Sequence, residues 1–211
     1  MIPAYYTRYL DDNTYDLSRY VFVQEALRKR RREAVIFCQH PRLLSAGIQS
    51  RRESLKTNPL ILRENNIGIY RVNRGGDYTA HEPGQCIIYP HIDLKKRGLR
   101  INQVVRKLLE ITGEAIFAVW EIPTSNKIGA PGLYLPNGAK LVSIGIMFKS
   151  CFTSFGLSVN ISNDLSTFQH IYPCGKSNLQ MTSIVASGGD PAGKNDFIRD
   201  WSKRFHFWLR D

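Results

Sequence analysis

The chain has 211 residues, of which 43% are hydrophobic and 22% charged, a balance typical of a globular protein with a buried core. Lys and Arg outnumber Asp and Glu by 29 to 18, giving a formal net charge of +11, which favours encounters with acidic proteins, nucleic acid or anionic membranes. No apolar run approaches the roughly 20 residues of a membrane-spanning helix. The first residues also lack a charged leader followed by an apolar segment. We therefore expect a cytoplasmic protein.

The sequence contains no repeat, low-complexity tract or flexible linker, so we expect one domain over residues 1–211. Its four cysteines lie far apart and none forms a CxxC pair, which argues against a disulfide framework or a zinc site. Cys38 and Cys86 lie in apolar stretches and are expected to be buried free thiols. The other two cysteines are Cys151 and Cys174.

Helical spacing first occurs over residues 14–31. We expect four apolar residues on the inward face of this helix: Leu17, Tyr20, Val21 and Leu27. The basic run at residues 28–32 falls where the helix should end, and cations are favourable there because of the helix dipole. A short buried strand is expected over residues 34–39. Residues 41–59 are expected to form a loop because Pro41 and Gly47 interrupt them.

Strands are expected at residues 67–72 and 86–89, on either side of a polar connection that contains glycines. Residues 102–120 are expected to form a helix whose apolar residues recur at helical spacing: Val105, Leu108, Leu109, Ile116 and Phe117. Further strands are expected at residues 132–135, 141–149 and 157–161. Helices thus surround and interrupt a strand-rich middle, so the predicted fold class is α+β.

The last helix carries an aromatic stripe whose members are spaced by four, four and three residues: Phe197, Trp201, Phe205 and Trp208. Such a stripe could stack on nucleic-acid bases or could pack against the protein core. Because one face of a surface helix normally packs on the core, we expect packing.

Residues 74–85, with the sequence RGGDYTAHEPGQ, place two glycines, a histidine and a Pro-Gly pair between two expected strands. Glycines allow the backbone to approach a ligand closely, and His81 could bind a reacting group or move protons near neutral pH. The alternative is a long hairpin connection that needs glycine for its dihedral angles. The segment contains neither the Walker pattern nor GxGxxG, so a phosphate-binding loop is not expected here.

Two further residues could carry chemistry. Cys174 lies between Pro173 and Gly175, so it should be on a turn and partly exposed, as a nucleophile must be. Lys140 follows an Asn-Gly turn at the start of an apolar strand-like stretch. Most such lysines are solvated, but one that points inward could exchange a proton with a thiol.

Taken in order, these segments resemble the motif series of the lipoyl(octanoyl) transferase family. The matching stretches are RGGDYTAHEPGQ, then APGLY and AKLVSIGI, then FGLSVNI, DLSTF and PCG. The earlier QHPRLLSAG is similar to the EHP…G loop of that family. The resemblance runs from about Ala34 to Cys174, and it implies an α+β fold like that of biotin and lipoate protein ligase catalytic domains, a mixed sheet flanked by helices.

The resemblance also implies roles for particular residues. Cys174 matches the cysteine that carries the acyl group as a thioester, and Lys140 matches the lysine that promotes its ionisation and exchanges protons with it. His81 matches a histidine that faces the same pocket. The segments that match the substrate-binding parts of the family contain the following residues: Arg74, Gly75, Gly76, Asp77, Tyr78, Thr79, Ala80, His81, Ser143, Ile144, Gly145, Gly156, Leu157 and Ser158.

The implied reaction transfers an octanoyl group from acyl carrier protein to a lysine of a lipoyl domain, the first step of endogenous protein lipoylation. The acceptors would be lipoyl domains of 2-oxoacid dehydrogenase complexes or the glycine-cleavage carrier protein. Exchange of one thioester for another needs no ATP, so no cofactor and no metal is expected. Both partners are typically acidic and suit the positive charge, whereas no membrane or nucleic-acid partner is expected.

Three positions depart from the family pattern. Ala80 stands where the family usually has Tyr, which would remove an aromatic side of the pocket, and Glu82 replaces Gly, which would add a carboxylate next to the site. Phe155 replaces the His that usually precedes Gly-Leu, so a polar contact near the thiol would be missing. These changes could alter the preferred chain length or the rate.

Two other functions have to be considered. An ATP-dependent lipoate or biotin protein ligase with the same fold would form an adenylate and need no cysteine, but its extended glycine loop is absent. A non-catalytic module could instead bind an acidic carrier, or nucleic acid, through its basic surface. Binding to nucleic acid would weaken steeply with salt and survive the loss of Cys174.

Overall fold

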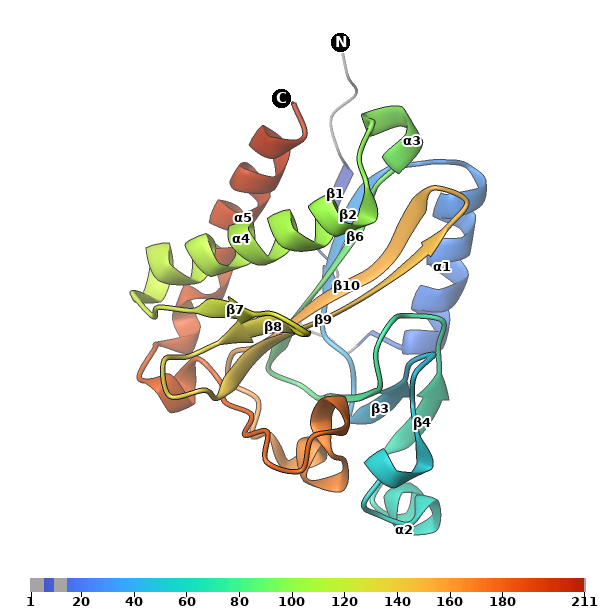
Figure 1. Cartoon of the computed structure of the whole chain (residues 1–211), viewed down its shortest axis with the longest axis vertical. Helices are drawn as coiled ribbons and strands as arrows, with labels where there is room; N and C mark the ends of the chain where they lie inside the picture. Colours follow the sequence, from blue (N-terminus) through green and yellow to red (C-terminus); the bar gives the residue numbers. More distant parts are fainter. Residues whose placement is uncertain (1–5, 10–14, 211) are drawn as a thin grey trace.

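In the computed structural model the described residues are 6–9 and 15–210, and they form a seven-stranded sheet and a three-stranded sheet with helices packed around them (Figure 1). The large sheet has the order β1-β2-β6-β10-β9-β8-β7. Its first pair is parallel and the other pairs are antiparallel. Its strands are β1 (Tyr6–Tyr9), β2 (Ala34–Cys38), β6 (Gln85–His91), β7 (Ser125–Lys127), β8 (Ala130–Tyr134), β9 (Lys140–Lys149) and β10 (Phe152–Asn160).

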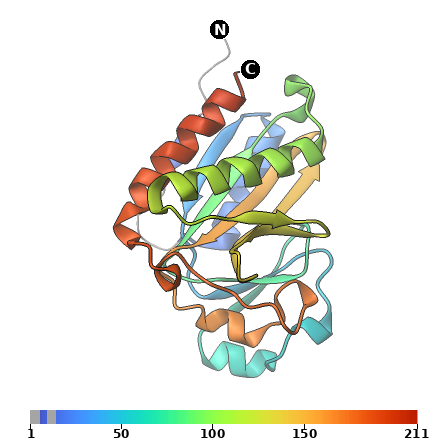
Figure 2. The same cartoon turned by 60° about the vertical axis from the view of Figure 1, so that its left-hand side comes forward.

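The small sheet has the order β4-β3-β5, with β3 parallel to β4 and antiparallel to β5. It consists of β3 (Leu43–Ala46), β4 (Gly68–Arg71) and β5 (Tyr78–His81). The small sheet and α2 (Pro59–Glu64) lie at the end of the molecule away from the last turn of the C-terminal helix, beside the short helices of the chain after residue 165 (Figure 2).

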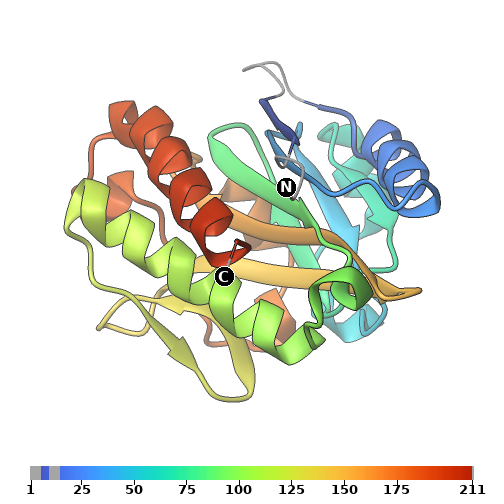
Figure 3. The same ribbon diagram turned by 90° about the horizontal axis from the view of Figure 1, so that it is seen from above.

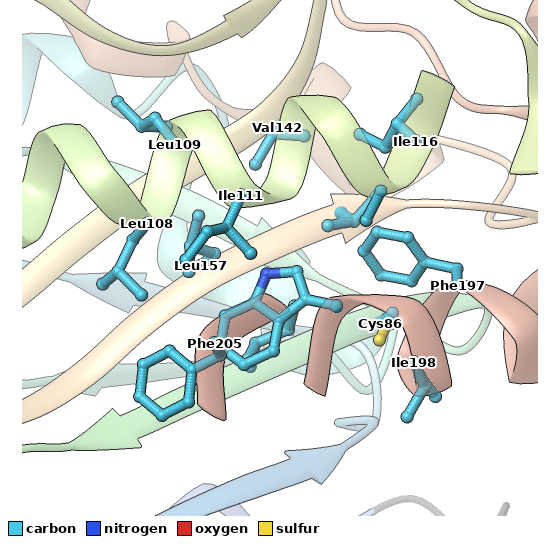
Figure 4. Close-up of a cluster of buried hydrophobic side chains, with 14 of the residues drawn as sticks. Cys86, Leu108, Leu109, Ile111, Ile116, Val142, Leu157, Phe197, Ile198 and Phe205 are labelled. Carbon is cyan, nitrogen blue, oxygen red and sulfur yellow. The ribbon is translucent and has the colours of Figure 1, made fainter. Parts of the chain in front are cut away.

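One face of the large sheet is covered by α4 (Ile101–Trp120) and α5 (Lys194–Trp208), which lie next to each other (Figure 3). The periodic apolar residues of both helices face the sheet and form the largest cluster of buried side chains with it (Figure 4). Within this cluster Trp201 stacks on Phe205 at 4.9 Å between ring centroids and donates a hydrogen bond of 2.9 Å to Thr112.

The other face of the sheet is covered by α1 (Leu17–Lys29), which begins where the side chain of Asp16 accepts a hydrogen bond from the amide of Ser18. Its buried Tyr20 stacks on Tyr89 of β6, with ring centroids 3.8 Å apart. The remaining helices are short: α3 (Leu94–Arg97) and the 3-10 helices η1 (Arg52–Ser54), η2 (Ser166–His170), η3 (Pro173–Gly175), η4 (Val185–Ser187) and η5 (Pro191–Gly193).

The predicted α+β class and the type of most elements are confirmed. The aromatic stripe of α5 packs in the core, because Phe197, Trp201 and Phe205 are fully buried and Trp208 packs against them. Cys38 and Cys86 are buried free thiols, as predicted. The basic run does lie at the end of α1, whereas residue 14, where this helix was expected to begin, lies outside the described residues.

Other predictions were wrong. The expected loop at residues 41–59 contains β3, all four residues of which are buried, and the expected polar connection after residue 72 contains β5. Val21 was expected on the inward face of its helix and Phe117 was counted in the apolar spacing of α4, but both are exposed, Phe117 to 56%. Val21 lies at the margin of the buried face of α1, and Phe117 lies on the side of α4 away from its buried residues. In the part of the chain that the structure describes, no helix has the length and apolar composition needed to cross a membrane.

Candidate active site

Cys174 lies at the centre of η3 on an exposed turn, as its Pro-Cys-Gly setting predicted. Its backbone has a φ of 57°, in the left-handed region that non-glycine residues seldom occupy. Hydrogen bonds from the amide of Gly175 to Tyr172 O and from the amide of Lys176 to Pro173 O close the turn. Backbone hydrogen bonds alone therefore close the turn, and the sulfur of Cys174 is left to interact with other segments.

The chain is attached to its surroundings on both sides of this turn. Before it, Ile171 pairs with Leu55, and the amide of Tyr172 donates to the carbonyl of Ser54. After it, Met181 pairs with Lys140, whose amide donates to Gln180 O and whose carbonyl accepts from the amide of Thr182. The lysine at the start of β9 is thus part of the backbone attachment of the cysteine loop.

The side chain of Lys140 is buried, with a residue exposure of 1%, and its Nζ lies 3.2 Å from Cys174 Sγ. Nζ also donates to the carbonyl of Pro131 at 3.1 Å and lies over the ring of Tyr134 at 5.4 Å. Burial of an ammonium group is costly unless it is hydrogen-bonded, and here a carbonyl, a sulfur and a ring face accept it. The inward orientation considered from the sequence is therefore the one observed.

Gly132 provides the space for this ammonium group. A Cβ atom at Gly132 would lie 2.5 Å from Cε and 3.1 Å from Nζ of Lys140, and also 2.5 Å from the carbonyl oxygen of Val142. Its φ of 144° is also in the region that L side chains rarely adopt. Only glycine at this position allows the lysine to reach the sulfur without displacement.

Cys174 and Lys140 line a cavity of about 980 Å³. The same cavity is lined by thirteen of the fourteen residues that the sequence suggested for substrate binding, brought together from the strands β5, β9 and β10 and a glycine segment: Arg74, Gly75, Gly76, Asp77, Tyr78, Thr79, His81, Ser143, Ile144, Gly145, Gly156, Leu157 and Ser158. Ala80 is the exception. Its side chain is fully buried in a separate apolar cluster with Leu44, Leu62 and Phe168, because alternation along β5 turns it away from the cavity.

His81 is buried at the side of the cavity, with both ring nitrogens in hydrogen bonds. Nε2 lies 3.1 Å from Ser45 Oγ, and Nδ1 lies 3.2 Å from Gln85 Oε1. The amide nitrogen of Gln85 donates to Ala80 O and to Asn160 Oδ1, so its oxygen accepts the Nδ1 proton of His81. Burial, with the nearby His40 and Arg74, holds the pKa of His81 well below its usual value. His81 is thus a neutral imidazole with its tautomer fixed.

Arg74 continues this network and brings a positive charge to the cavity. Its Nε and Nη2 donate to Ser45 Oγ at 3.1 and 2.8 Å, and Nη2 also donates to Ser45 O. Burial lowers the pKa of Arg74 to about 10, so the guanidinium stays charged at neutral pH. Such a charge favours anionic groups in the cavity, whether a thiolate or an oxyanion.

The carboxylate of Asp77 packs against the cysteine turn at Gly175. It accepts hydrogen bonds from the amides of Arg51 and Tyr78 and from the hydroxyl of Ser54. A Cβ atom at Gly175 would lie 3.2 Å from this carboxylate, which shows how closely the turn packs against it. Asp77 therefore joins the glycine segment, η1 and the cysteine turn.

Of the two other departures from the family pattern, Glu82 lies away from the cavity and Phe155 lies where the sequence suggested. Glu82, only 1% exposed, does not line the cavity; its carboxylate accepts hydrogen bonds from the side chain of Asn163 and the amides of Leu165 and Thr167. The expectation of an extra carboxylate next to the site was therefore wrong. Phe155 does line the cavity.

Several residues of the site were missed in the sequence. Ser45 connects His81 to Arg74, Leu17 and Tyr89 line the buried part of the cavity, and Gly132 makes room for Lys140. The glycine of APGLY was a detectable signal, since a glycine inside a strand indicates close approach of another group. Across residues 6–9 and 15–210, no three His, Cys, Asp or Glu side chains gather as a metal ion would require.

The model of the lipoyl protein ligase A/B catalytic domain matches residues 15–206 of the chain. An octanoyltransferase of Leptospira interrogans is 42% identical over 174 residues, which cover 82% of this chain and 81% of that protein. The chain belongs to the octanoyltransferase family. An octanoyltransferase of Ralstonia pickettii is also similar, with 31% identity over 80% of this chain and 73% of its own length. Like other octanoyltransferases, the chain is an acyltransferase.

Solved structures confirm the predicted fold of this octanoyltransferase family member. A bipartite lipoate protein ligase from Thermoplasma acidophilum superposes with a TM-score of 0.74 at 15% identity, covering 96% of this chain and 85% of that chain. A lipoate-protein ligase A bound with ATP superposes with a TM-score of 0.71 at 12% identity, covering 98% and 86%. At such low identity the likeness concerns the fold alone.

Proposed function

We propose that this protein transfers an octanoyl group from acyl carrier protein to a lysine of a lipoyl domain through a thioester on Cys174. The observation that carries the proposal is the hydrogen bond of 3.2 Å from Lys140 Nζ to Cys174 Sγ at a largely apolar cavity. We further propose that residues 1–211 act as a single catalytic domain in the cytoplasm, without cofactor or metal.

In the first step, the ionised sulfur of Cys174 attacks the carbonyl carbon of the octanoyl thioester. The bond to the carrier's sulfur breaks, and that sulfur leaves as a thiolate that takes a proton from the Lys140 ammonium. Lys140 suits this role because its Nζ already touches the sulfur, so the proton has a short distance to travel. One thioester replaces another, and no nucleotide is needed to drive the exchange.

In the second step, the amine of the acceptor lysine attacks the acyl group on Cys174. The carbon–sulfur bond breaks, an amide forms, and the proton lost by the amine passes to Lys140, which restores its ammonium form. The product amide is more stable than a thioester, so the step runs downhill. Splitting the transfer in two is ordinary covalent catalysis.

The negative charge on the reacting oxygen needs a partner. The amide of Gly75, in the glycine segment, already donates to Ile146 O. The guanidinium of Arg74 supplies positive charge at the same cavity instead. His81 keeps this arrangement in place through Ser45 and does not itself move a proton, since both its nitrogens are bonded.

The mouth of the cavity suits two acidic protein partners. Arg51 and Lys176 are exposed residues that line it, and the whole chain carries a formal charge of +11. Positive charge around a cavity raises the rate of encounter with acidic carriers, and this effect weakens with salt.

The proposal is tested by incubating the purified protein with octanoyl acyl carrier protein and measuring intact masses. Wild type should gain one octanoyl group, and Cys174→Ala should gain none. Cys151→Ser is the matched control, because Cys151 is also an exposed free thiol and should not carry the acyl group. Addition of a lipoyl domain should then remove the octanoyl group from the enzyme and place it on the domain.

An equal adduct on wild type and Cys174→Ala would refute the thioester. The ATP-dependent ligase alternative makes a different prediction, namely that free octanoate and ATP modify the lipoyl domain and that Cys174→Ala still does so. The relatives at 42% and 31% identity are octanoyltransferases, whereas the ligases are similar only in fold.

A further inference from the structure

The ring of Phe155 lies on an unexpected face of the sheet. Alternation along β10 would place it under α4 and α5, but it lies on the opposite face. Leu157 and Val159, at two and four residues from it, pack in the cluster under α4 and α5. Phe155 instead packs in the cluster under α1. The reason is its φ of 60°, a left-handed conformation that turns the side chain to the other face.

This conformation is costly for a bulky aromatic residue, and the surroundings hold it in place. The amide of Phe155 donates a buried hydrogen bond of 2.8 Å to the hydroxyl of Tyr20. The ring makes edge contacts with the rings of Tyr20 and Tyr89, with centroids 5.4 and 6.0 Å away. Histidine, the usual residue here in the family that the sequence resembles, is more often found in left-handed conformations, so phenylalanine is the less favourable choice for the backbone.

Phe155 lines the cavity, in the lining strand pair that lies farthest along β9 from Lys140. β9 begins at the reactive lysine, and three successive pairs of β9 and β10 line the cavity: Ser143 with Ser158, Ile144 with Leu157, and Gly145 with Gly156. The next pair contains Phe155. We call this part of the cavity, between Lys140 and Phe155, the acyl slot.

A second apolar part of the cavity lies beside Ile101 and Val105 of α4. These two residues are only partly buried, whereas Phe155, Leu17 and Tyr89 are almost completely buried. An alkyl chain loses more contact with water among the second group, and each buried CH₂ group stabilises its binding. The chain should therefore run towards Phe155 and not towards α4.

We propose that the ring of Phe155 is the end of the acyl slot and sets the longest alkyl chain that the protein accepts. This inference rests on the proposed function, because it assigns the acyl group to the same cavity. A smaller side chain at position 155 leaves space beyond Gly145 and Gly156, and longer fatty acyl groups then fit.

The inference is tested by calorimetric binding of free octanoate, decanoate and dodecanoate to wild type, Phe155→Ala and Phe155→Leu. Wild type should bind octanoate best. In Phe155→Ala the affinity for decanoate relative to octanoate should rise about tenfold, since each newly buried CH₂ group is worth about fourfold. Phe155→Leu should give a smaller rise and serves if the alanine variant does not fold.

Phe152→Ala is the matched control. Phe152 is a fully buried phenylalanine of the same strand, stacked on His91 and absent from the cavity lining, so its loss should lower stability without changing the order of the three affinities. An unchanged ratio of decanoate to octanoate affinity in folded Phe155→Ala or Phe155→Leu would overturn the inference, as would failure of wild type to bind any of the three acids. Binding does not depend on Cys174 chemistry, so failure of the mass experiment alone would refute only the proposed thioester.

Discussion

The two faces of the large sheet bury different kinds of side chain. Under α4 and α5 the cluster is almost entirely apolar, and Trp201 bonded to Thr112 is a rare polar contact. Towards α1 and the small sheet, the buried residues include three histidines and an arginine: His40, His81, His91 and Arg74. Buried polar groups cost stability unless they are hydrogen-bonded. The apolar face under α4 and α5 thus stabilises the fold. The buried polar groups that form the reactive cavity, which lower stability, lie on the opposite face.

The largest expected effect concerns the reactive side. Lys140→Met keeps the volume of the side chain but removes the proton donor next to Cys174, so octanoyl transfer should slow by about 10² to 10⁴. Alkylation of the thiol near neutral pH should slow as well. Intact-mass time courses measure both rates in a Cys151→Ser background.

Lys127→Met is the control for this prediction. Lys127 Nζ lies 4.5 Å from the centroid of the same Tyr134 ring, but the residue is exposed and does not line the cavity. It should react as wild type does. If Lys140→Met and Lys127→Met show the same rates, the proposed part of Lys140 is wrong.

On the α4/α5 face, Trp201→Ala should lower the free energy of unfolding by about 3–5 kcal/mol, because a fully buried indole leaves a large cavity. Denaturant unfolding measures the loss, with Trp208→Ala as a milder control since Trp208 is only partly buried. The folded fraction should keep the wild-type rate of Cys174 acylation. A slower rate per folded molecule would mean that the two faces are coupled.

Gly132→Ala should lower stability, because its Cβ would lie 2.5 Å from the carbonyl oxygen of Val142, and should also cause a large loss of activity. The added methyl group collides with Cε of Lys140, and a displacement of about 1 Å at a reacting group can cost about 10²-fold in rate. Gly98→Ala is the control, because Gly98 also has a positive φ of 63° but no atom within 4 Å of an added Cβ. If both variants had equal activity, the methyl group at position 132 would not displace the Lys140 ammonium. Glycine would then be needed at position 132 only for its backbone conformation.

The smallest effect is a change in the pH dependence of stability. Burial lowers the pKa of His91 to about 4, so the unfolded chain binds a proton below pH 6.5 that the folded protein does not bind until about pH 4. Stability should therefore fall as the pH decreases from 6.5 towards 4. Each such histidine contributes up to about 1.4 kcal/mol per pH unit.

His91→Phe should make this decrease less steep, as measured by denaturant unfolding between pH 5 and 7.5. Burial also lowers the pKa of His40 to about 4 and holds the pKa of His81 well below its usual value, so part of the decrease should remain. His206→Phe is the comparison on α5, where the pKa is lowered for a partly exposed ring. An identical slope for wild type and His91→Phe would contradict the burial argument.

The same comparison explains what the sequence could predict. On the α4/α5 side, apolar residues recur at helical spacing because nothing but packing constrains them. On that basis α4 was predicted within one residue at each end, and α5 was expected as a helix from its aromatic stripe. On the other side, β3 and β5 were missed. Leu43–Ala46 is a short apolar run between Pro41 and Gly47, and Tyr78–His81 is polar, since its residues line a cavity on one face.

The reactive pair was recognisable only through the order of the motifs. Pro-Cys-Gly predicts an exposed turn, but nothing local to Lys140 says that its side chain points inward. That orientation depends on Gly132 and on the pairing with Met181, which are contacts between distant segments. The network from His81 through Ser45 to Arg74 likewise exists only once β3, β5 and the segment before β5 come together in the small sheet.

The backbone pairing between Lys140 and Met181 has a consequence for motion. Because the amide and carbonyl of Lys140 hold residues 180 and 182, the first residue of β9 cannot detach without releasing the downstream end of the cysteine loop. Local opening of this corner would therefore separate thiol and ammonium in one event. Amide hydrogens of Lys140 and Thr182 should then exchange with solvent at a common rate. That rate would report how often the enzyme opens to a state in which thiol and ammonium are apart and no acyl transfer can occur.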